Sequence, residues 1–219
     1  LFGVILVPPF ILIPIFLSEL SNYPLHLVGL SICPSGIGGM ISTFFTSNII
    51  SLVGNRLTMT LGLSLYALSS FDFTFWNSNV SNLHVIINGI IRGSGISIYY
   101  VGLATATYVT LPGKYRNDAS SVFQFFRNFG SGLALAILIT FLDRYSKINY
   151  EELSSSITLG SQHWEVLKSL EVLKNTGVSP TYFLSSLISK EATMSALIYN
   201  FYLLTIVPIM FMPLLILFK

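Results

Sequence analysis

The sequence predicts an all-α membrane protein with six transmembrane helices. Only 9% of the 219 residues are charged and 53% are hydrophobic, whereas about 25% of the residues in a soluble domain are charged. The apolar residues are collected in six long runs, and about 20 largely apolar residues are enough to cross a bilayer as a helix. A soluble chain of this composition would lack the polar surface needed to cover its core.

Each expected span is bounded by a polar turn. The six spans are predicted at about residues 1–17, 24–53, 57–76, 83–111, 119–142 and 194–218. Three prolines in the first span, Pro8, Pro9 and Pro14, are compatible with a membrane helix because neighbouring helices can satisfy the carbonyls that proline leaves free. The chain begins at Leu1 inside a hydrophobic run, which predicts a fragment of a longer protein.

Basic residues in the short loops predict the orientation. They are Arg56, Lys114 and Arg116, joined at the end of the chain by Lys219. The alternate loops, residues 18–23 and 77–82, contain no lysine or arginine. Because lysine and arginine in short loops favour the cytoplasm, the first span is expected to start there and the C-terminus to return there.

The chain therefore divides into three predicted parts. They are residues 1–142 with the first five spans, residues 143–191 as a long extracytoplasmic loop, and residues 192–219 with the last span. Within the loop, Gln162–Asn175 is expected to form a short amphipathic helix, with its apolar face made by Trp164, Leu167 and Leu170. This helix either rests on its own protein or the membrane interface, or docks a partner.

Two arginines lie inside predicted spans, Arg92 in the fourth and Arg127 in the fifth. On insertion scales an arginine at mid-membrane costs about 2.5–3.5 kcal/mol. Both side chains are therefore expected to face a protein interior or a water-filled cavity, which is typical of proteins that transport solutes or ions.

The fourth span carries a polar stripe made by Asn88, Arg92 and Tyr99. Spacings of four and seven place these residues on one helical face. Gly89 and Gly93 lie beside them and predict the close approach of another helix. The stripe is expected to line a substrate or proton pathway.

A structural role for Arg92 is the alternative. Asp72, in the outer part of the third span, is the acidic residue placed well inside a span. An internal ion pair between Asp72 and Arg92 would anchor the helix bundle without any part in transport.

The fifth span has a second polar stripe. Its members are Ser120, Gln124, Arg127, Asn128 and Ser131. Gly130 and Gly132 lie next to it and predict close helix packing. A helix this polar on one side cannot face lipid there, so the stripe is expected at a cavity or at a seam between helices.

The sequence does not favour an enzyme, a metalloprotein or a nucleic-acid-binding protein. The histidines His26 and His84 fall near span ends and His163 falls in the long loop, and none has a metal-ligand spacing such as HExxH. The single cysteine, Cys33, excludes a disulfide framework. No cofactor, metal or nucleic-acid partner is expected.

Several short motifs occur in a fixed order along the chain. The first are Leu12-Ile-Pro-Ile-Phe-Leu-Ser-Glu19, Tyr23, Gly29-Leu30 and Pro34-Ser-Gly36. The later ones are Val53-Gly-Asn-Arg56, Arg92-Gly-Ser-Gly95, Asn117-Asp-Ala-Ser-Ser121, Phe125-Phe-Arg127 with Gly130, and Ala192-Thr-Met194 with Phe201. In order and spacing they resemble the C-terminal half of EmrB/QacA-like drug:proton antiporters, the 14-helix branch of the major facilitator superfamily. The resemblance covers essentially all of the chain.

This resemblance implies one six-helix half of a major facilitator superfamily transporter. In that fold the first and fourth helices line the cavity, the second and fifth form the seam with the other half, and the third and sixth face lipid. Gly54 and Arg56 would be the remnant of a cytoplasmic loop motif. The chain departs from the family pattern at Ser51 and Leu52, where more polar residues are usual, and at Asn200, where relatives often have an acidic residue.

The implied function is proton-coupled efflux of drugs or other small molecules across the inner or plasma membrane by alternating access. Asn88, Arg92 and Tyr99 would line the cavity, and the inter-half seam would include Gln124, Arg127 and Asn128. The proton gradient would be the energy source, without a cofactor.

The expected partners are the N-terminal half of the same transporter, a small-molecule substrate and the lipid bilayer. A periplasmic membrane-fusion protein and an outer-membrane channel are further candidates. Two alternatives remain open. The chain could serve an exporter of another solute class, such as a siderophore, sugar or amino acid, or it could be a non-transporting remnant of a split transporter gene.

Overall fold

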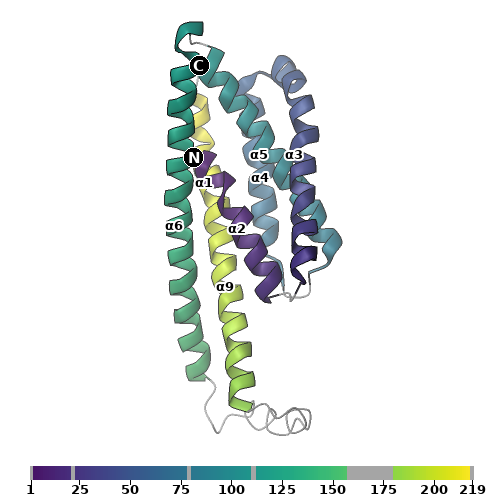
Figure 1. Cartoon of the computed structure of the whole chain (residues 1–219), viewed down its shortest axis with the longest axis vertical. Coiled ribbons are helices and arrows are strands. Elements are labelled where there is room, and N and C mark those ends of the chain that lie inside the picture. The colour runs from purple at the N-terminus through teal and green to yellow at the C-terminus, as the bar shows by residue number, and fades with distance from the viewer. Residues whose placement is uncertain (1, 21–22, 78–79, 110–111, 157–179, 218–219) are drawn as a thin grey trace.

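The computed structural model describes residues 2–20, 23–77, 80–109, 112–156 and 180–217, and these form an all-helical bundle (Figure 1). The α-helices are α1 (Phe2–Leu6), α2 (Pro8–Ile15), α3 (Leu25–Val53), α4 (Asn55–Phe73), α5 (Asn82–Val109), α6 (Arg116–Ser156) and α9 (Pro180–Phe211). Three short segments complete the described chain: a π-helical turn η1 (Phe16–Leu20) and the 3-10 turns η2 (Gly113–Tyr115) and η3 (Pro213–Leu217). The described residues contain no β-strand, which confirms the all-α prediction.

Five helical stretches are long and apolar enough to cross a membrane. They are Phe2–Leu20, His26–Val53, Asn82–Tyr108, Gly113–Ser155 and Ser185–Leu215. These correspond to five of the six predicted spans. The predicted third span forms α4, a helix of 19 residues that packs between α5 and α9. Because α4 carries several hydroxyl side chains and Asp72, it is less apolar than the other five, and its crossing of the membrane stays a prediction.

The first span is a broken helix because of its prolines. It bends at Val7, between α1 and α2, immediately before Pro8 and Pro9. Proline lacks a backbone N–H and its ring clashes with the preceding turn, so a helix breaks or kinks there. Pro14 lies inside α2, and the helix continues beyond it as the π-helical turn η1.

The long loop predicted at residues 143–191 is shorter than hydropathy suggested. The helix α6 does not end at Leu142 but continues to Ser156, and α9 begins at Pro180. The polar extension packs against α9 through a stack of the Tyr145 and Tyr199 rings, whose centroids are 5.4 Å apart. Hydropathy marks where a helix stops being apolar, whereas helix–helix contacts keep its backbone helical beyond that point. In Figure 1 both helices extend past the rest of the bundle at its lower end.

The amphipathic helix predicted at Gln162–Asn175 lies outside the described residues, as does His163. The structure therefore leaves that prediction as it stands. The extracytoplasmic position of the loop likewise stays a prediction.

Aromatic rings join η1, α4 and α9 in the larger core, to which α2 contributes Leu12 and Ile13. The Phe73 ring stacks on Phe201 with centroids 3.6 Å apart and on Trp76 with centroids 4.3 Å apart, and Phe16 meets it edge-on at 5.1 Å. Asn200 adds a polar link, because its Nδ2 donates to the Leu138 carbonyl of α6 at 3.1 Å.

Small residues set the distance between α3 and α5. A Cβ atom on Gly93 would meet the backbone of Ser35, and one on Gly38 would lie 2.6 Å from the Ile90 carbonyl oxygen. The prediction that the glycines of the fourth span allow another helix to approach is thus confirmed at Gly93. Nothing in this chain lies within 4 Å of a Cβ built on Gly130 or on Gly132, so the close packing predicted for the fifth span is not made here, and its contact with another half stays a prediction.

Candidate functional site

The Arg92 side chain is buried between α5 and α4. Only 4% of its surface is exposed, and its charge interacts with Tyr66 on α4. Within the part of the chain that the structure describes, Arg92 Nε, Tyr66 Oη and Ser70 Oγ are all buried and make no hydrogen bond. Burying a charge costs free energy unless an opposite charge or hydrogen bonds compensate it. Arg92 therefore favours an arrangement in which its guanidinium gains such a partner.

The predicted ion pair between Asp72 and Arg92 is not formed. Among the described residues, the ion pairs are His84–Asp72 and Lys147–Asp143. Asp72 lies in the last turn of α4, beside His84 and Asn88, and Arg92 lies one further turn along α5. The four residues from Asn88 to Arg92 advance about 6 Å along the helix axis. Asp72 therefore bonds His84 and Asn88, which lie beside it, and not Arg92.

Asp72 is the centre of a hydrogen-bond network. Its Oδ2 atom accepts from Trp76 Nε1 at 3.1 Å, from His84 Nε2 at 2.9 Å and from Asn88 Nδ2 at 2.9 Å. The imidazole–carboxylate contact is partly open to solvent, since 49% of the His84 side chain and 40% of the Asp72 side chain are exposed. The network therefore starts at the surface of the bundle.

Asn88 carries the network into the interior. It is 4% exposed, and besides Asp72 it bonds Ser69 of α4 in both directions. Ser69 Oγ donates to Asn88 Oδ1 at 2.9 Å, and Asn88 Nδ2 donates to the Ser69 carbonyl at 2.9 Å. Both hydrogens of the amide are used, as a buried polar side chain requires.

Tyr99 lies further along the same face of α5. Its side chain is 3% exposed and its ring lies 6.0 Å from that of Phe2 on α1. A Cβ atom on Gly62 of α4 would lie 2.5 Å from the Tyr99 backbone nitrogen, so α4 and α5 are in close contact here. The predicted stripe of the fourth span thus packs along α4 in this structure rather than lining an open cavity, and its role in transport stays a prediction.

The predicted seam residues lie on α6, the apolar helix that the rest of the described chain covers least. Gln124 and Arg127 are half-buried and Asn128 is exposed on α6. Ser131, at the same helix, is held against α1 because its Oγ donates to the Gly3 carbonyl at 3.0 Å. The exposed apolar side chains around the stripe are Val122, Phe125, Phe126, Phe129 and Leu133.

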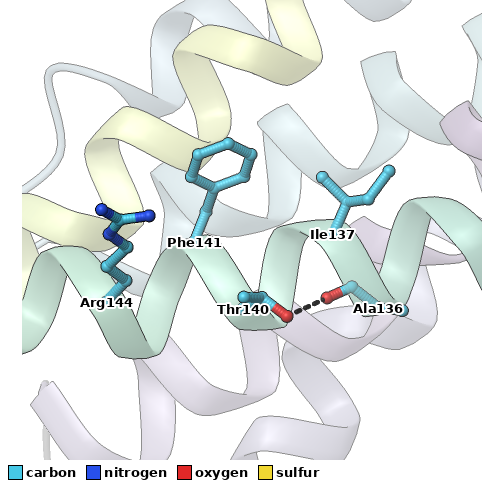
Figure 2. A pocket seen from close by; sticks show the side chains of 5 residues that line it. All are labelled: Ala136, Ile137, Thr140, Phe141 and Arg144. Atoms are coloured by element: carbon cyan, nitrogen blue, oxygen red, sulfur yellow. Dashed lines mark hydrogen bonds between the residues drawn. The ribbon is translucent and has the colours of Figure 1, made fainter.

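A shallow groove of about 330 Å³ lies along the uncovered side of α6. Figure 2 shows the side chains that line it: Ala136, Ile137, Thr140, Phe141 and Arg144. Within it the Thr140 hydroxyl donates to the Ala136 carbonyl at 2.7 Å, so the helix backbone satisfies the hydroxyl (Figure 2). The groove has an apolar wall with a single cation, and none of the predicted cavity residues lies in it.

The predicted loop-motif remnant forms the turn from α3 to α4. Gly54 has φ 86° and ψ 160°, a backbone conformation that is essentially confined to glycine. Arg56 is exposed in the first turn of α4. The sequence therefore needs glycine at this turn for its geometry, and the gating role of the motif is untested.

Sequence reasoning missed His84, Trp76, Ser69 and Tyr66. His84 could have been found, because it lies four residues before Asn88 and so extends the stripe of Asn88 and Arg92 by one turn. The α4 partners could not, since nothing in the sequence fixes which face of α4 meets α5.

Curated proteins with similar sequences are transporters. The chain is 24% identical over 205 residues, 87% of its length, to the colistin resistance protein EmrB of Acinetobacter baumannii. It is 24% identical over 152 residues to the probable multidrug resistance protein EmrY of Escherichia coli, and 24% identical over 134 residues to the multidrug export protein EmrB of Haemophilus influenzae. No protein-family model matches the chain.

These similarities confirm the predicted resemblance to EmrB-like transporters. The chain spans 38%, 29% and 26% of the length of these three relatives. Together with the five apolar helices, the similarities indicate a multi-pass protein of the cell membrane.

Proposed function

We propose that the chain is the C-terminal half of a proton-coupled exporter of drugs or other small molecules. The observation that carries this proposal is the similarity to a colistin resistance protein over 87% of the chain, and to proteins named for multidrug resistance and multidrug export over 67% and 60% of it. The buried Arg92 between α4 and α5 supports it, because ionisable residues inside membrane bundles are characteristic of transport pathways.

The proposed architecture is one half of a transporter built from two related halves. Among the helices long enough to span a membrane, α6 and α3 are the least covered, with 17% and 28% of their most apolar stretches buried. Arg127 and Gln124 on α6 are half-exposed polar groups, which lipid cannot satisfy. A second half packed against α3 and α6 would cover them. We place the substrate site between the halves, with alternating access through rocking of one half against the other.

In this proposal Arg92 and Asn88 become accessible to the cavity when α4 and α5 move apart. Tyr99, Arg92 and Asn88 would then form its polar wall. The proton gradient would drive the cycle, and Arg56, Lys114 and Arg116 would face the cytoplasm. A periplasmic membrane-fusion protein and an outer-membrane channel are candidate partners on the opposite side.

Transport by the whole protein encoded by the gene tests the proposal. The protein is reconstituted in vesicles with an imposed pH gradient, and the movement of cationic dyes and of anionic solutes is followed with and without a protonophore. We expect gradient-dependent dye transport that the protonophore abolishes. A preference for anionic solutes would instead favour the exporter of another solute class, for which the cation Arg92 is equally suited.

The third possibility, a non-transporting remnant, has its own discriminator. The DNA directly upstream of the coding region either encodes further membrane spans in frame or does not. Further in-frame spans, together with dye transport, would exclude the remnant. Stable insertion without transport of any solute in the panel would support it.

A further inference from the structure

The partly exposed contact between Asp72 and His84 has a second property besides holding α4 to α5. We propose that these two side chains form the proton-binding site through which the proton gradient acts on this helix pair. This inference rests on the exporter function proposed above and gives it a proton acceptor in this chain.

Geometry makes the pair suitable for proton exchange with bulk water. The Asp72 Oδ2 and His84 Nε2 atoms are 2.9 Å apart, and both side chains are partly exposed. They lie where α4 ends and α5 begins, the end of the bundle that the proposed orientation places outside the membrane. A proton from the external water can therefore reach either group without crossing the bundle.

The hydrogen bonds around Asp72 define what a proton would change. An ionised carboxylate only accepts hydrogen bonds, so in this structure His84 Nε2, Asn88 Nδ2 and Trp76 Nε1 all donate to the same oxygen. A proton taken from water onto Asp72 neutralises the carboxylate, and these bonds lose the strengthening that a charged acceptor provides.

Asn88 passes the change inward. Among the described residues, it is the side chain that bonds both the partly exposed carboxylate and the buried Ser69. Weakening the bond to Asp72 leaves Asn88 held by Ser69 alone, and the close α4–α5 contact then has one fewer link near its outer end. Movement of α4 against α5 becomes easier in the protonated state.

Arg92 gives the proton a second point of action. Asp72 is the single acidic residue on α4 and α5, and Arg92 is the single arginine on α5. Arg92 makes no ion pair within the described chain, and its charge interacts with Tyr66 on the facing side of α4. Loosening the α4–α5 contact through Asn88 would favour a conformation in which the buried guanidinium reaches water or substrate.

The neighbouring elements bring other titratable groups to this end of the bundle. They are Glu19 in η1, Tyr23, His26 at the start of α3, and Tyr199 and Tyr202 on α9. In the described part of the chain, none of them bonds Asp72 or His84, and the Tyr23 hydroxyl donates to the Val80 carbonyl at 3.4 Å. We therefore assign the proposed proton binding to Asp72 and His84 and not to these neighbouring groups.

The first test separates proton coupling from substrate movement. Asp72→Asn and His84→Gln are made in the whole protein, and two activities are measured in vesicles: accumulation driven by a pH gradient, and exchange of labelled for unlabelled substrate without a gradient. We expect both variants to lose driven accumulation and to keep exchange. Matched controls are Asp143→Asn, in the exposed Lys147 ion pair, and His26→Gln. Driven accumulation retained in Asp72→Asn would overturn the proposal.

The second test needs no transport. The Trp76 ring lies 5.7 Å from the His84 ring and its Nε1 donates to Asp72, so a charge change on either group alters the surroundings of the indole. The emission of Trp76 is obtained as the difference between the protein and its Trp76→Phe variant and is followed against pH. We expect a titration that disappears in Asp72→Asn and shifts or disappears in His84→Gln, and that persists in His26→Gln.

The two tests fail in different ways. Absence of all solute movement in the wild-type protein, with the Trp76 titration intact, would overturn the proposed exporter and leave a proton-binding pair. Driven transport together with a Trp76 emission that does not respond to pH would overturn the pair and leave the exporter. A purely structural pair would lower the abundance of both variants equally with no change in coupling, and that result also contradicts the inference.

Discussion

Ser69 and Asn88 exchange hydrogen bonds across the contact of α4 with α5. The Ser69 hydroxyl donates to the Asn88 side-chain oxygen and the Asn88 amide donates back to the Ser69 carbonyl, each at 2.9 Å. Both residues are almost completely buried. Because a slip of either helix would break both bonds at once, this exchange fixes the register in which α4 meets α5.

Replacing Asn88 by leucine should destabilise the helix pair. The variant keeps a branched side chain but removes one of the three donors to Asp72 and both side-chain bonds to Ser69. The Ser69 hydroxyl then keeps only a long bond of 3.3 Å to the carbonyl of residue 88. A buried polar group left unsatisfied costs about 1–3 kcal/mol. We expect a lower thermal unfolding temperature in detergent, measured by loss of the monodisperse peak after heating.

The exposed Asn117, in the first turn of α6, provides the matched control. Asn117→Leu changes the same atoms without breaking a buried bond and should unfold at nearly the wild-type temperature. An equal loss in both variants would mean that the Ser69–Asn88 exchange does not stabilise the bundle.

Gly93 should tolerate no side chain. A Cβ atom there would meet the backbone of Ser35 on α3, which cannot move independently of its helix. Overpacking of this kind costs about 1–3 kcal/mol, so Gly93→Ala should lower the unfolding temperature. Gly36→Ala is the control, because nothing lies within 4 Å of a Cβ at Gly36 and alanine favours a helix. A stable Gly93→Ala variant would show that α3 and α5 can separate at little cost.

The sequence was sufficient to predict the helices but not all of their neighbours. Hydrophobic run length predicts where membrane helices lie, and five of the predicted spans are found as such. The glycines show the limit of sequence reasoning, since Gly93 and Gly130 have similar settings in the sequence, yet one touches α3 and the other faces open space. A small residue allows close approach, but the partner helix must be known before a contact can be assigned.

The same limit explains the error at Asp72. Complementary charge predicted a bond to Arg92, whereas the alignment of α4 with α5 sets Asp72 beside His84 and Asn88. Charge alone does not determine the axial level of two residues. The four-residue spacing of His84, Asn88 and Arg92 was visible in the sequence, and it carried more information than the charges did.

Gly54 should be sensitive to any side chain for a backbone reason. Its φ of 86° and ψ of 160° lie in a region that costs a non-glycine residue about 1–3 kcal/mol. Gly54→Ala and Gly54→Asn are both expected to lower the unfolding temperature, because asparagine tolerates the left-handed helical region rather than this one. Gly113→Ala, at a glycine without positive φ, is the control. If Gly54→Asn instead unfolded at the wild-type temperature, the turn would adopt the left-handed helical conformation and not the one described.

The orientation of the bundle can be tested by cysteine labelling. With Cys33 replaced by alanine, single cysteines are placed at Ser155, in the last turns of α6, and at Ser51, near the end of α3; both side chains are exposed. The charge of the short loops predicts that α6 ends outside the cell. A membrane-impermeant thiol reagent should label intact cells at Ser155 and not at Ser51. Labelling at Ser51 alone would invert the topology.

We expect Arg92 to be needed for transport while lowering the stability of the folded protein. Its guanidinium is buried with an unbonded Nε and no ion pair among the described residues, and a buried charge without a partner opposes folding. Arg92→Met should therefore insert normally and unfold at an equal or higher temperature, yet lose export in vesicles. Arg92→Lys keeps the charge without the planar fork and should retain part of the activity. If Arg92 were a structural anchor, Arg92→Met would instead lose abundance and unfold at a lower temperature, and a neutral Asp72→Asn partner would not restore it, because the two side chains do not touch. Normal export in Arg92→Met would remove the buried cation from the mechanism altogether.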